Sequence, residues 1–318
     1  MEHYGIVREF SNAGFHETEQ HRLILREVIA AIRHGKFVAL SGVIGCGKTT
    51  MLNHLQTQLA ETGDILVAKS HSVDKERVTL STLMLALFYD LSTERDFVIP
   101  TKAEKRERAL RDLIRKRKKP VVLFIDEAHD LPRKTLVDLK RLMEMVRDGD
   151  GILSIVLAGH PRLKNDLRRP TMEEIGNRAT VFSMDKVHGE NRDYIYWLFG
   201  QCTKSETAAH TLCDDEAVDL LADRLKTPLQ IEEHLTRALE EAFQVGGRPV
   251  GRDVVEAVLA KDINDLEPTL VRHGYGTKAL AEILDISTKE VRRFVRGQLP
   301  PGRTSELQSQ LLKAGVPL

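Results

Sequence analysis

One eight-residue stretch, Gly42-Val-Ile-Gly-Cys-Gly-Lys-Thr49, constrains the fold of this chain more than any other feature. It fits the pattern G-x-x-x-x-G-K-[ST], in which glycines let successive backbone N–H groups turn inward around phosphate oxygens. A strand leads into such a loop and a helix follows it, so that the positive end of the helix faces the anion. We therefore expect a phosphate-binding loop between a buried strand at 37–40 and a helix that starts at Lys48.

The segments around this loop predict the fold class. Further strand-like apolar segments lie at 65–68, 121–125, 152–158 and 179–182, and helical patterns separate them. Strands that alternate with helices form parallel sheets with helices on both faces. The sequence thus predicts an α/β P-loop core over residues 1–185, with an amphipathic lead-in helix before the first strand.

The strand pattern stops near residue 186. Helical periodicities then follow at about 191–201, 215–225, 231–243 and 251–261. We interpret 186–262 as a helical lid and 263–318 as a C-terminal, helix-turn-helix-like domain.

Two carboxylates follow the apolar strand at 121–125. Asp126 and Glu127 would lie at the carboxyl edge of the sheet, where ligands of parallel sheets bind. We expect Asp126 to organise Mg²⁺ and Glu127 to act as the base for the attacking water. The alternative for an acidic pair is a solvated strand end, but the upstream phosphate loop favours the functional interpretation.

The predicted cofactors are therefore ATP and Mg²⁺. Lys48 should reach the β- and γ-phosphates, and Thr49 should bind the metal together with Asp126. The full set of predicted nucleotide-binding residues is Gly42, Val43, Ile44, Gly45, Cys46, Gly47, Lys48, Thr49, Thr50 and Asp126.

Several motifs in order resemble those of the AAA+ ATPases, and within them the group that holds the secretion ATPase ExeA and the transposition ATPases TnsC, TniB and MuB. Besides the phosphate loop, they are Phe15-His-Glu-Thr18, Phe124-Ile-Asp-Glu-Ala-His-Asp130 and Val156-Leu-Ala-Gly-His-Pro-Arg-Leu163. The resemblance covers about residues 10–245.

The resemblance implies two further site residues. His160, just past the fourth strand, would be the sensor of the γ-phosphate or the attacking water, with an ordinary loop histidine as the alternative. Arg178 would be the arginine finger that completes a neighbouring subunit's site, with Arg168 and Arg169 as rivals. The lid differs from the pattern of these ATPases at one place. Leu229 and Gln230 occupy the region in which many relatives have the sensor-2 arginine.

Composition excludes some classes of function. No apolar run is long enough to span a bilayer, and the N-terminus does not resemble a secretory signal. The three cysteines, at 46, 202 and 213, are scattered. These features predict a cytoplasmic protein without a membrane role.

The net charge is zero, but basic residues gather in two regions. Residues 102–119 hold ten Lys or Arg against three acids, which suggests that Lys116, Lys118 and Lys119 contact DNA phosphates. The alternative is a solvated helix end whose cations complement the helix dipole.

The second basic region lies near the C-terminus. Ser287-Thr-Lys-Glu290 is a capping box that opens a helix with Val291, Phe294 and Val295 on one face. A short turn at Asp285 joins it to the preceding helix, which is typical of a helix-turn-helix, although glycine is usual at that position. DNA contact is the first interpretation and partner docking the second; the basic residues are Lys289, Arg292, Arg293 and Arg296.

These features lead to one functional hypothesis. The chain would be an ATPase that assembles into a ring or helical filament, binds double-stranded DNA in its ATP state, and recruits a transposase or integrase. The rivals are an ExeA-like secretion or signalling ATPase with a protein-docking C-terminal domain, and a replication-initiator ATPase.

Substitutions in the two motifs should separate ATP binding from hydrolysis. Lys48→Ala should weaken ATP binding, because it removes the cation that holds the phosphates. Glu127→Gln should keep ATP bound and slow hydrolysis, because the amide cannot take a proton from water. Nucleotide titrations and steady-state hydrolysis measure the two effects, and equal ATP affinity in wild type and Lys48→Ala would contradict the site assignment.

Overall fold

The computed structural model describes residues 2–70, 75–93, 98–169, 172–176, 178–184, 191–203, 209–259, 270–271, 273–295 and 298–316. The chain divides into two compact units. Residues 18–42 and 48–184 form the first, here called the sheet unit. Residues 1–17, 43–47 and 185–318 form the second, here called the helical unit.

The sheet unit is built around a five-stranded sheet in the order β2-β3-β4-β1-β5, with every pair of neighbouring strands parallel. Each strand begins and ends within one residue of its predicted range, and the α/β parallel fold class is confirmed. The strands are β1 (Phe37–Ser41), β2 (Leu66–Lys69), β3 (Val121–Ile125), β4 (Leu153–Gly159) and β5 (Ala179–Ser183).

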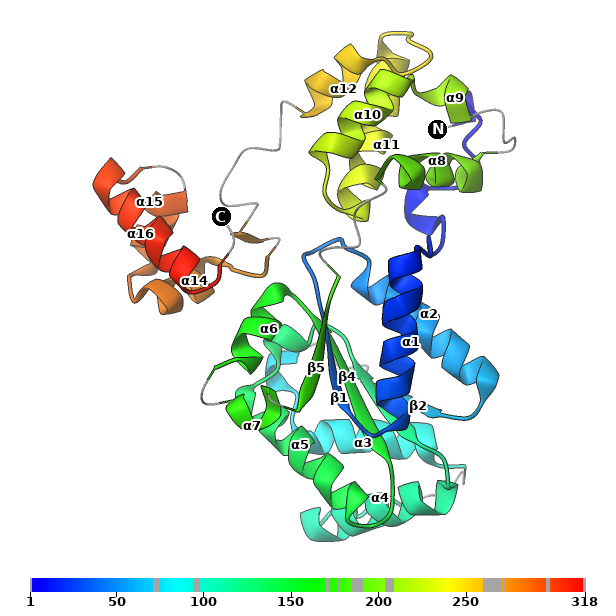
Figure 1. Ribbon diagram of the computed structural model, residues 1–318, viewed down its shortest axis with the longest axis vertical. Helices are drawn as coiled ribbons and strands as arrows, with labels where there is room; N and C mark the ends of the chain where they lie inside the picture. The colour runs from blue at the N-terminus through cyan, green and yellow to red at the C-terminus, as the bar shows by residue number, and fades with distance from the viewer. Residues whose placement is uncertain are drawn as a thin grey trace. The chain divides into compact units, whose positions relative to one another are not determined.

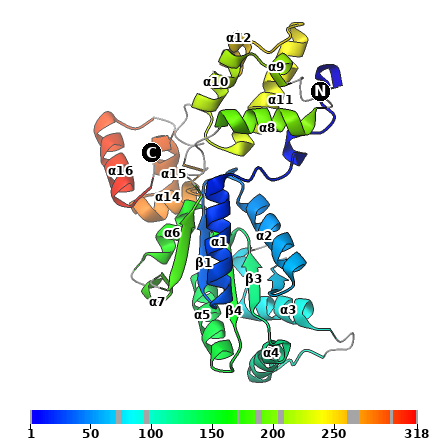
Figure 2. The same ribbon diagram turned by 45° about the vertical axis from the view of Figure 1, so that its right-hand side comes forward.

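Helices cover both faces of this sheet (Figure 1, Figure 2). Because successive side chains of a strand alternate between faces, Ala39, Leu123 and Ile155 share one core with helices α3, α4 and α5. On the opposite face, where α1 and α2 lie, the hydroxyl of Ser154 donates to the carbonyl of Ile32 at 2.7 Å. The helices are α1 (Glu19–Arg33), α2 (Lys48–Thr62), α3 (Leu80–Leu91), α4 (Ala103–Arg117) and α5 (Arg133–Arg147).

Short elements near the strand ends complete the sheet unit. They are the 3₁₀ helices η3 (Lys75–Arg77) and η4 (Ala128–Asp130), and the helices α6 (Pro161–Leu167) and α7 (Glu173–Gly176).

The lead-in helix α1 starts where side chains can cap it. The Thr18 hydroxyl accepts the backbone N–H of His21 at 3.2 Å, and the His21 Nδ1 accepts the N–H of Thr18 at 3.3 Å. This reciprocal capping satisfies two N–H groups that lack a partner within the helix. The predicted lead-in helix is therefore present and begins at Glu19.

The helical unit includes five helices that follow the sheet in sequence, and the first residues of the chain pack among them. Tyr4, Ile6 and Phe10, in and beside η1 (Glu2–Tyr4) and η2 (Phe10–Asn12), share a buried core with Leu198, Phe199 and the helices that follow. The sequence predicts that residues 1–17 belong to the nucleotide-binding core, whereas Tyr4, Ile6, Phe10 and Ala13 pack in the helical unit. The helices are α8 (Asn191–Cys202), α9 (Ala209–Leu212), α10 (Asp215–Arg224), α11 (Pro228–Gln244) and α12 (Arg252–Leu259).

Three helices near the C-terminus enclose a small core of their own: α14 (Thr277–Leu284), α15 (Thr288–Val295) and α16 (Pro301–Lys313). Asp285, between α14 and α15, has φ of 52°, the left-handed conformation that glycine usually provides. The chain thus makes the short turn without glycine. Val291, Phe294 and Val295 are buried, as their spacing predicts.

Half of the predicted capping box at α15 is present. The Ser287 hydroxyl accepts the N–H of Glu290 at 3.2 Å. The Glu290 carboxylate instead accepts a hydrogen bond from Arg303 of α16 at 2.9 Å. The Glu290 carboxylate, which would complete the capping box, is therefore paired with Arg303 of α16 instead. Sequence reasoning did not single out α16.

Among the described helices, none is long and apolar enough to cross a membrane.

The core of the C-terminal helices should depend on Phe294, which is 1% exposed. Phe294→Ala should destabilise these helices by about 3–5 kcal/mol, because it removes a buried aromatic from a small core. Phe243→Ala is a matched control, because Phe243 is 58% exposed. Hydrogen exchange of residues 273–316 in the full chain measures the effect, and equal exchange in the two variants would contradict it.

Candidate nucleotide-binding site

The candidate site lies at the carboxyl ends of three adjacent strands. The parallel register places Ser41 of β1 opposite Gly159 of β4, and Ile125 of β3 opposite Leu157 of β4. The N–H of Gly42 also donates to the carbonyl of Gly159 at 3.1 Å. The residues that follow β1, β3 and β4 therefore meet at one edge of the sheet.

The phosphate loop has the backbone that its glycines predict. Gly45 and Gly47 have φ of 80° and 86°, in the region that side chains disfavour. Helix α2 begins at Lys48, as predicted. The Lys48 side chain is buried, and its Nζ donates to the Gly42 carbonyl at 2.9 Å. The ammonium is thus held beside the loop that would surround a phosphate.

The two predicted Mg²⁺ residues are in contact. The Thr49 hydroxyl donates to Oδ2 of Asp126 at 2.7 Å, although the two residues are 77 positions apart. The other Asp126 oxygen accepts the N–H of Glu127 at 2.9 Å. A hydroxyl and a carboxylate are the hard oxygen ligands that Mg²⁺ prefers, so these residues fit the ion.

Glu127 has a strained backbone and a perturbed carboxyl. Its φ of 52° and ψ of 37° are unusual for a residue with a side chain, and such strain gathers at functional sites. Burial and the Asp126 carboxylate raise the pKa of Glu127, while Lys48 and Lys75 oppose the increase. A carboxyl with a raised pKa is a better general base for water than an ordinary one.

Two histidines lie beside this carboxylate. His160, which follows β4, has its Nε2 at 3.7 Å from Oε2 of Glu127. His129 of η4 has its Nδ1 at 3.4 Å from the same oxygen. Their ring centroids are 3.7 Å apart. Burial lowers the pKa of His129 to about 4 and that of His160 to about 3, so both rings are neutral near pH 7.

Gly159 makes this close approach possible. A Cβ atom built there would lie 3.1 Å from the backbone nitrogen of His129. A larger residue would push η4, and with it His129, away from the end of β4.

Sequence reasoning missed His129 and Lys75. His129 lies inside the motif Phe124–Asp130, but nothing in the sequence pairs it with a residue 31 positions later. Lys75 approaches from η3, and burial lowers its pKa while Asp126 and Glu127 raise it. The sequence around Lys75 contains no motif that indicates a functional role, because only the tertiary fold brings this lysine near Asp126 and Glu127.

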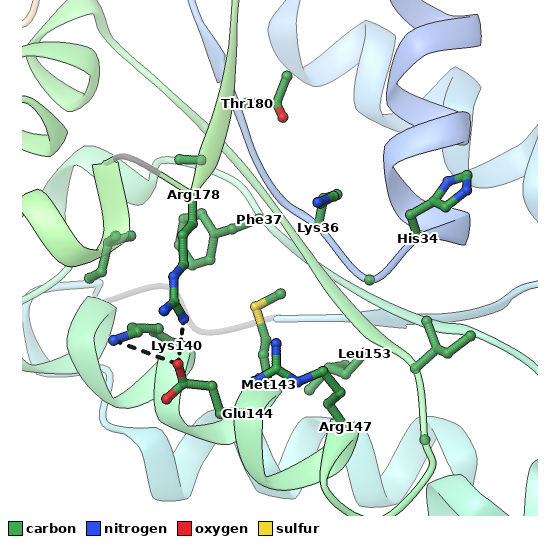
Figure 3. A pocket seen from close by; sticks show the side chains of 15 residues that line it. His34, Lys36, Phe37, Lys140, Met143, Glu144, Arg147, Leu153, Arg178 and Thr180 are labelled. Atoms are coloured by element: carbon green, nitrogen blue, oxygen red, sulfur yellow. Dashed lines mark hydrogen bonds and ion pairs between the residues drawn. The ribbon is translucent and has the colours of Figure 1, made fainter.

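Arg178 lies at the opposite edge of the sheet, immediately before β5. Its guanidinium donates to the Glu144 carboxylate of α5 at 2.5 Å, and Lys140 lies 3.6 Å from the same oxygen (Figure 3). The side chain is 59% exposed and lines a pocket of about 550 Å³ with Lys36 and Arg147. The structure therefore does not bring Arg178 to the Asp126 edge of its own subunit.

The rival arginines lie near the end of α6. Arg169 pairs with Asp166 at 3.1 Å, and Arg168 is exposed.

The lid residues that replace an arginine make backbone and local contacts. Thr227 caps α11, and the N–H of Leu229 donates to the carbonyl of Gly45 at 3.2 Å. The Gln230 side chain accepts the N–H of Lys226 at 3.0 Å. Within the helical unit, a main-chain hydrogen bond thus joins the phosphate-loop segment to the start of α11.

The predicted DNA-binding residues differ in their surroundings. Lys116 and Lys118 are exposed at the end of α4, while Lys119 donates to the Gly63 carbonyl at 2.7 Å. Lys289, Arg292 and Arg293 are exposed on α15. Arg296 lies outside the described residues.

Comparison with known proteins agrees with this site. Residues 31–167 match the model of a family described as AAA domain. General secretion pathway protein A of Aeromonas hydrophila is 31% identical over 155 residues, which are 46% of this chain and 26% of that protein. The chain thus spans about a quarter of that relative's length.

Two solved structures share the fold. Cdc6p of Pyrobaculum aerophilum aligns with a TM-score of 0.53 and 15% identity, over 98% of this chain and 91% of that one. Drosophila ORC bound to DNA aligns with a TM-score of 0.53 and 17% identity, over 92% and 77%.

The parallel sheet, the phosphate loop and the Thr49–Asp126 pair define a P-loop nucleotide-binding protein. More narrowly, residues 31–167 match the family described as AAA domain, and the chain shares the fold of Cdc6p of Pyrobaculum aerophilum and of Drosophila ORC.

Two glycine substitutions test the geometry of the loop. Alanine at Gly45 or Gly47 should cost about 1–2 kcal/mol for its left-handed backbone and weaken ATP binding. Gly45→Ala should weaken it more, because the new Cβ would lie 2.6 Å from the Cβ of Leu229, whereas nothing lies within 4 Å at Gly47.

Titration of a fluorescent ATP analogue into both variants, with and without Leu229→Gly, measures this difference. The second substitution should recover affinity only in Gly45→Ala. Recovery in neither background would contradict the close contact.

Proposed function

We propose that this protein is an ATP-dependent DNA-binding ATPase that self-associates and acts as a transposition helper or target-selection regulator. In this proposal, subunits assemble with ATP at their interfaces into a ring or helical filament. The assembly binds double-stranded DNA and recruits a transposase or integrase, and hydrolysis then disassembles it.

One observation carries the DNA-binding part of the proposal. Helix α15 holds Val291 and Phe294 in the core and leaves Lys289, Arg292 and Arg293 exposed. A second helix that is anchored by one face and basic on the other can enter the major groove. Glu290, the only acid of α15, is paired with Arg303, so its charge opposes DNA binding less.

The chain's own residues have defined roles in hydrolysis. Lys48 and the loop N–H groups bind the phosphates, and Thr49 and Asp126 hold Mg²⁺, which when bound neutralises phosphate charge. Glu127 accepts the proton of the attacking water, and His160 senses the γ-phosphate. Arg178, exposed at the other edge, would enter a neighbour's site after leaving Glu144.

Lys116 and Lys118 form a secondary proposal for DNA contact, because both are exposed. The alternative of a helix end gains support from Lys119, whose ammonium binds the Gly63 carbonyl.

The recruitment of a transposase rests on the resemblance of the motifs to transposition ATPases. The relative named general secretion pathway protein A favours a second candidate, a secretion or signalling ATPase whose C-terminal helices dock a protein. A replication-initiator ATPase would also bind DNA, but should read a defined sequence. The C-terminal helices therefore discriminate between the first two candidates.

DNA binding should require ATP and decrease steeply with salt, because an assembly neutralises many phosphates at once. Fluorescence anisotropy of a labelled duplex with ATP, ADP or no nucleotide measures the requirement. Arg292→Ala with Arg293→Ala should weaken binding by about 1–3 kcal/mol per residue that contacts a base edge, and by less for a phosphate contact.

The control for this experiment is the pair Arg26→Ala and Arg224→Ala, which removes equal charge from exposed positions on other helices. Equal binding in all nucleotide states would contradict the ATP switch. Wild-type DNA affinity in the Arg292 and Arg293 double variant would favour the docking candidate.

A further inference from the structure

Three potential metal ligands converge beside the nucleotide site. They are the Glu127 carboxylate and one ring nitrogen each of His129 and His160, and the three ligand atoms lie within 4.8 Å of one another. Two of the separations, from Glu127 Oε2 to His129 Nδ1 and to His160 Nε2, are 3.4 and 3.7 Å. Around a tetrahedral ion with bonds of about 2.0–2.2 Å, ligand atoms lie roughly 3.3–3.6 Å apart. These two separations are close to those of a metal site, and the stacked rings of His129 and His160, with centroids 3.7 Å apart, would turn apart to direct both nitrogens at one ion.

Most of each histidine side chain is buried, and in each ring the Nδ1 atom lacks a hydrogen-bond partner among the described residues. The His129 side chain is 7% exposed, and its Nδ1 has no hydrogen-bond partner among the described residues. This nitrogen is the one that faces Glu127. Buried polar atoms without hydrogen bonds are rare in folded proteins. A bound metal would give this nitrogen a partner.

A second carboxylate lies on the far side of His129. Oδ2 of Asp130 is 3.7 Å from the His129 Nε2, while Nδ1 faces Glu127. Metal-binding histidines commonly direct their second nitrogen toward a carboxylate, which orients the ring and strengthens the ligand. The cluster thus includes an outer carboxylate as well as three potential ligands.

We propose that Glu127, His129 and His160 form a regulatory site for a borderline divalent transition metal, of which Zn²⁺ is the probe. Two imidazoles and one carboxylate suit Zn²⁺, whereas Mg²⁺ prefers the oxygen ligands of Thr49 and Asp126. The two positions are thus chemically distinct although they are adjacent. The fourth position of a tetrahedral ion remains for water or a phosphate oxygen.

Occupation of this site would slow hydrolysis, and this consequence rests on the proposed function. Glu127 would donate its lone pair to the metal and could no longer accept the proton of the attacking water. The loop, Lys48 and Thr49 are not ligands, so ATP should still bind. The ion would therefore hold the protein in its ATP state.

Direct binding tests the site without any measurement of activity. The full chain, freed of metal and without nucleotide, is titrated with Zn²⁺ against a chromogenic chelator. Wild type should bind one ion at this site, and Glu127→Gln, His129→Asn and His160→Asn should each weaken it about 10-fold or more. His34→Asn is the matched control, because His34 is exposed and outside the cluster.

Two further measurements distinguish metal binding at this cluster from misfolding of a variant and from metal binding at a cysteine. Retained affinity of Glu127→Gln for a fluorescent ATP analogue verifies that this variant is folded. A Co²⁺ spectrum without thiolate charge-transfer bands excludes Cys46 of the loop as a ligand. Equal Zn²⁺ affinity in wild type and all three ligand variants would overturn the proposal.

Hydrolysis assays test the regulatory consequence separately. With Mg²⁺ and ATP present, Zn²⁺ should lower kcat of the wild type several-fold and leave ATP affinity unchanged. If the ligand variants lose Zn²⁺ binding but no variant and no condition gives ATP hydrolysis, the metal site is supported. The proposed enzymatic function is then rejected. Hydrolysis unaffected by bound Zn²⁺ would overturn the regulatory role.

Discussion

The hydrogen bond from Thr49 to Asp126 depends on the register of three strands. It joins the last residue of the phosphate loop, which follows β1, to the residue after β3, and β4 lies between these two strands. A slip of one residue in a strand would exchange its two faces and move its last residue along the edge. Burial on both faces fixes the register, because every residue of β1, β3 and β4 is buried. The chemistry of the site thus follows from the packing of the sheet.

Much of this sheet could be predicted from sequence, because the signals are local. Apolar runs marked the strands to within one residue, and Lys48 marked the start of α2. The place of residues 1–17 could not be predicted. Tyr4 and Phe10 carry no periodic pattern, and their partners lie almost 200 residues later. Only the completed fold determines which apolar surface such a segment covers.

The site shows the same division. Lys48, Thr49, Asp126 and Glu127 follow from motifs whose chemistry demands them, and the structure places Thr49 beside Asp126. His129 gains its meaning only beside His160, since adjacent strands bring the two rings together. Arg178 stands before β5 as expected, but its pairing with Glu144 depends on how α5 packs. The roles that the resemblance implies for single residues, the sensor at His160 and the arginine finger at Arg178, therefore remain predictions.

The main-chain bond from Leu229 to Gly45 has a consequence for how this sequence can evolve. A contact made by an arginine side chain is lost with a single codon change. A contact made by a peptide N–H survives replacement by any residue except proline, which has no such group. Position 229 is therefore free to drift without loss of its link to the phosphate loop.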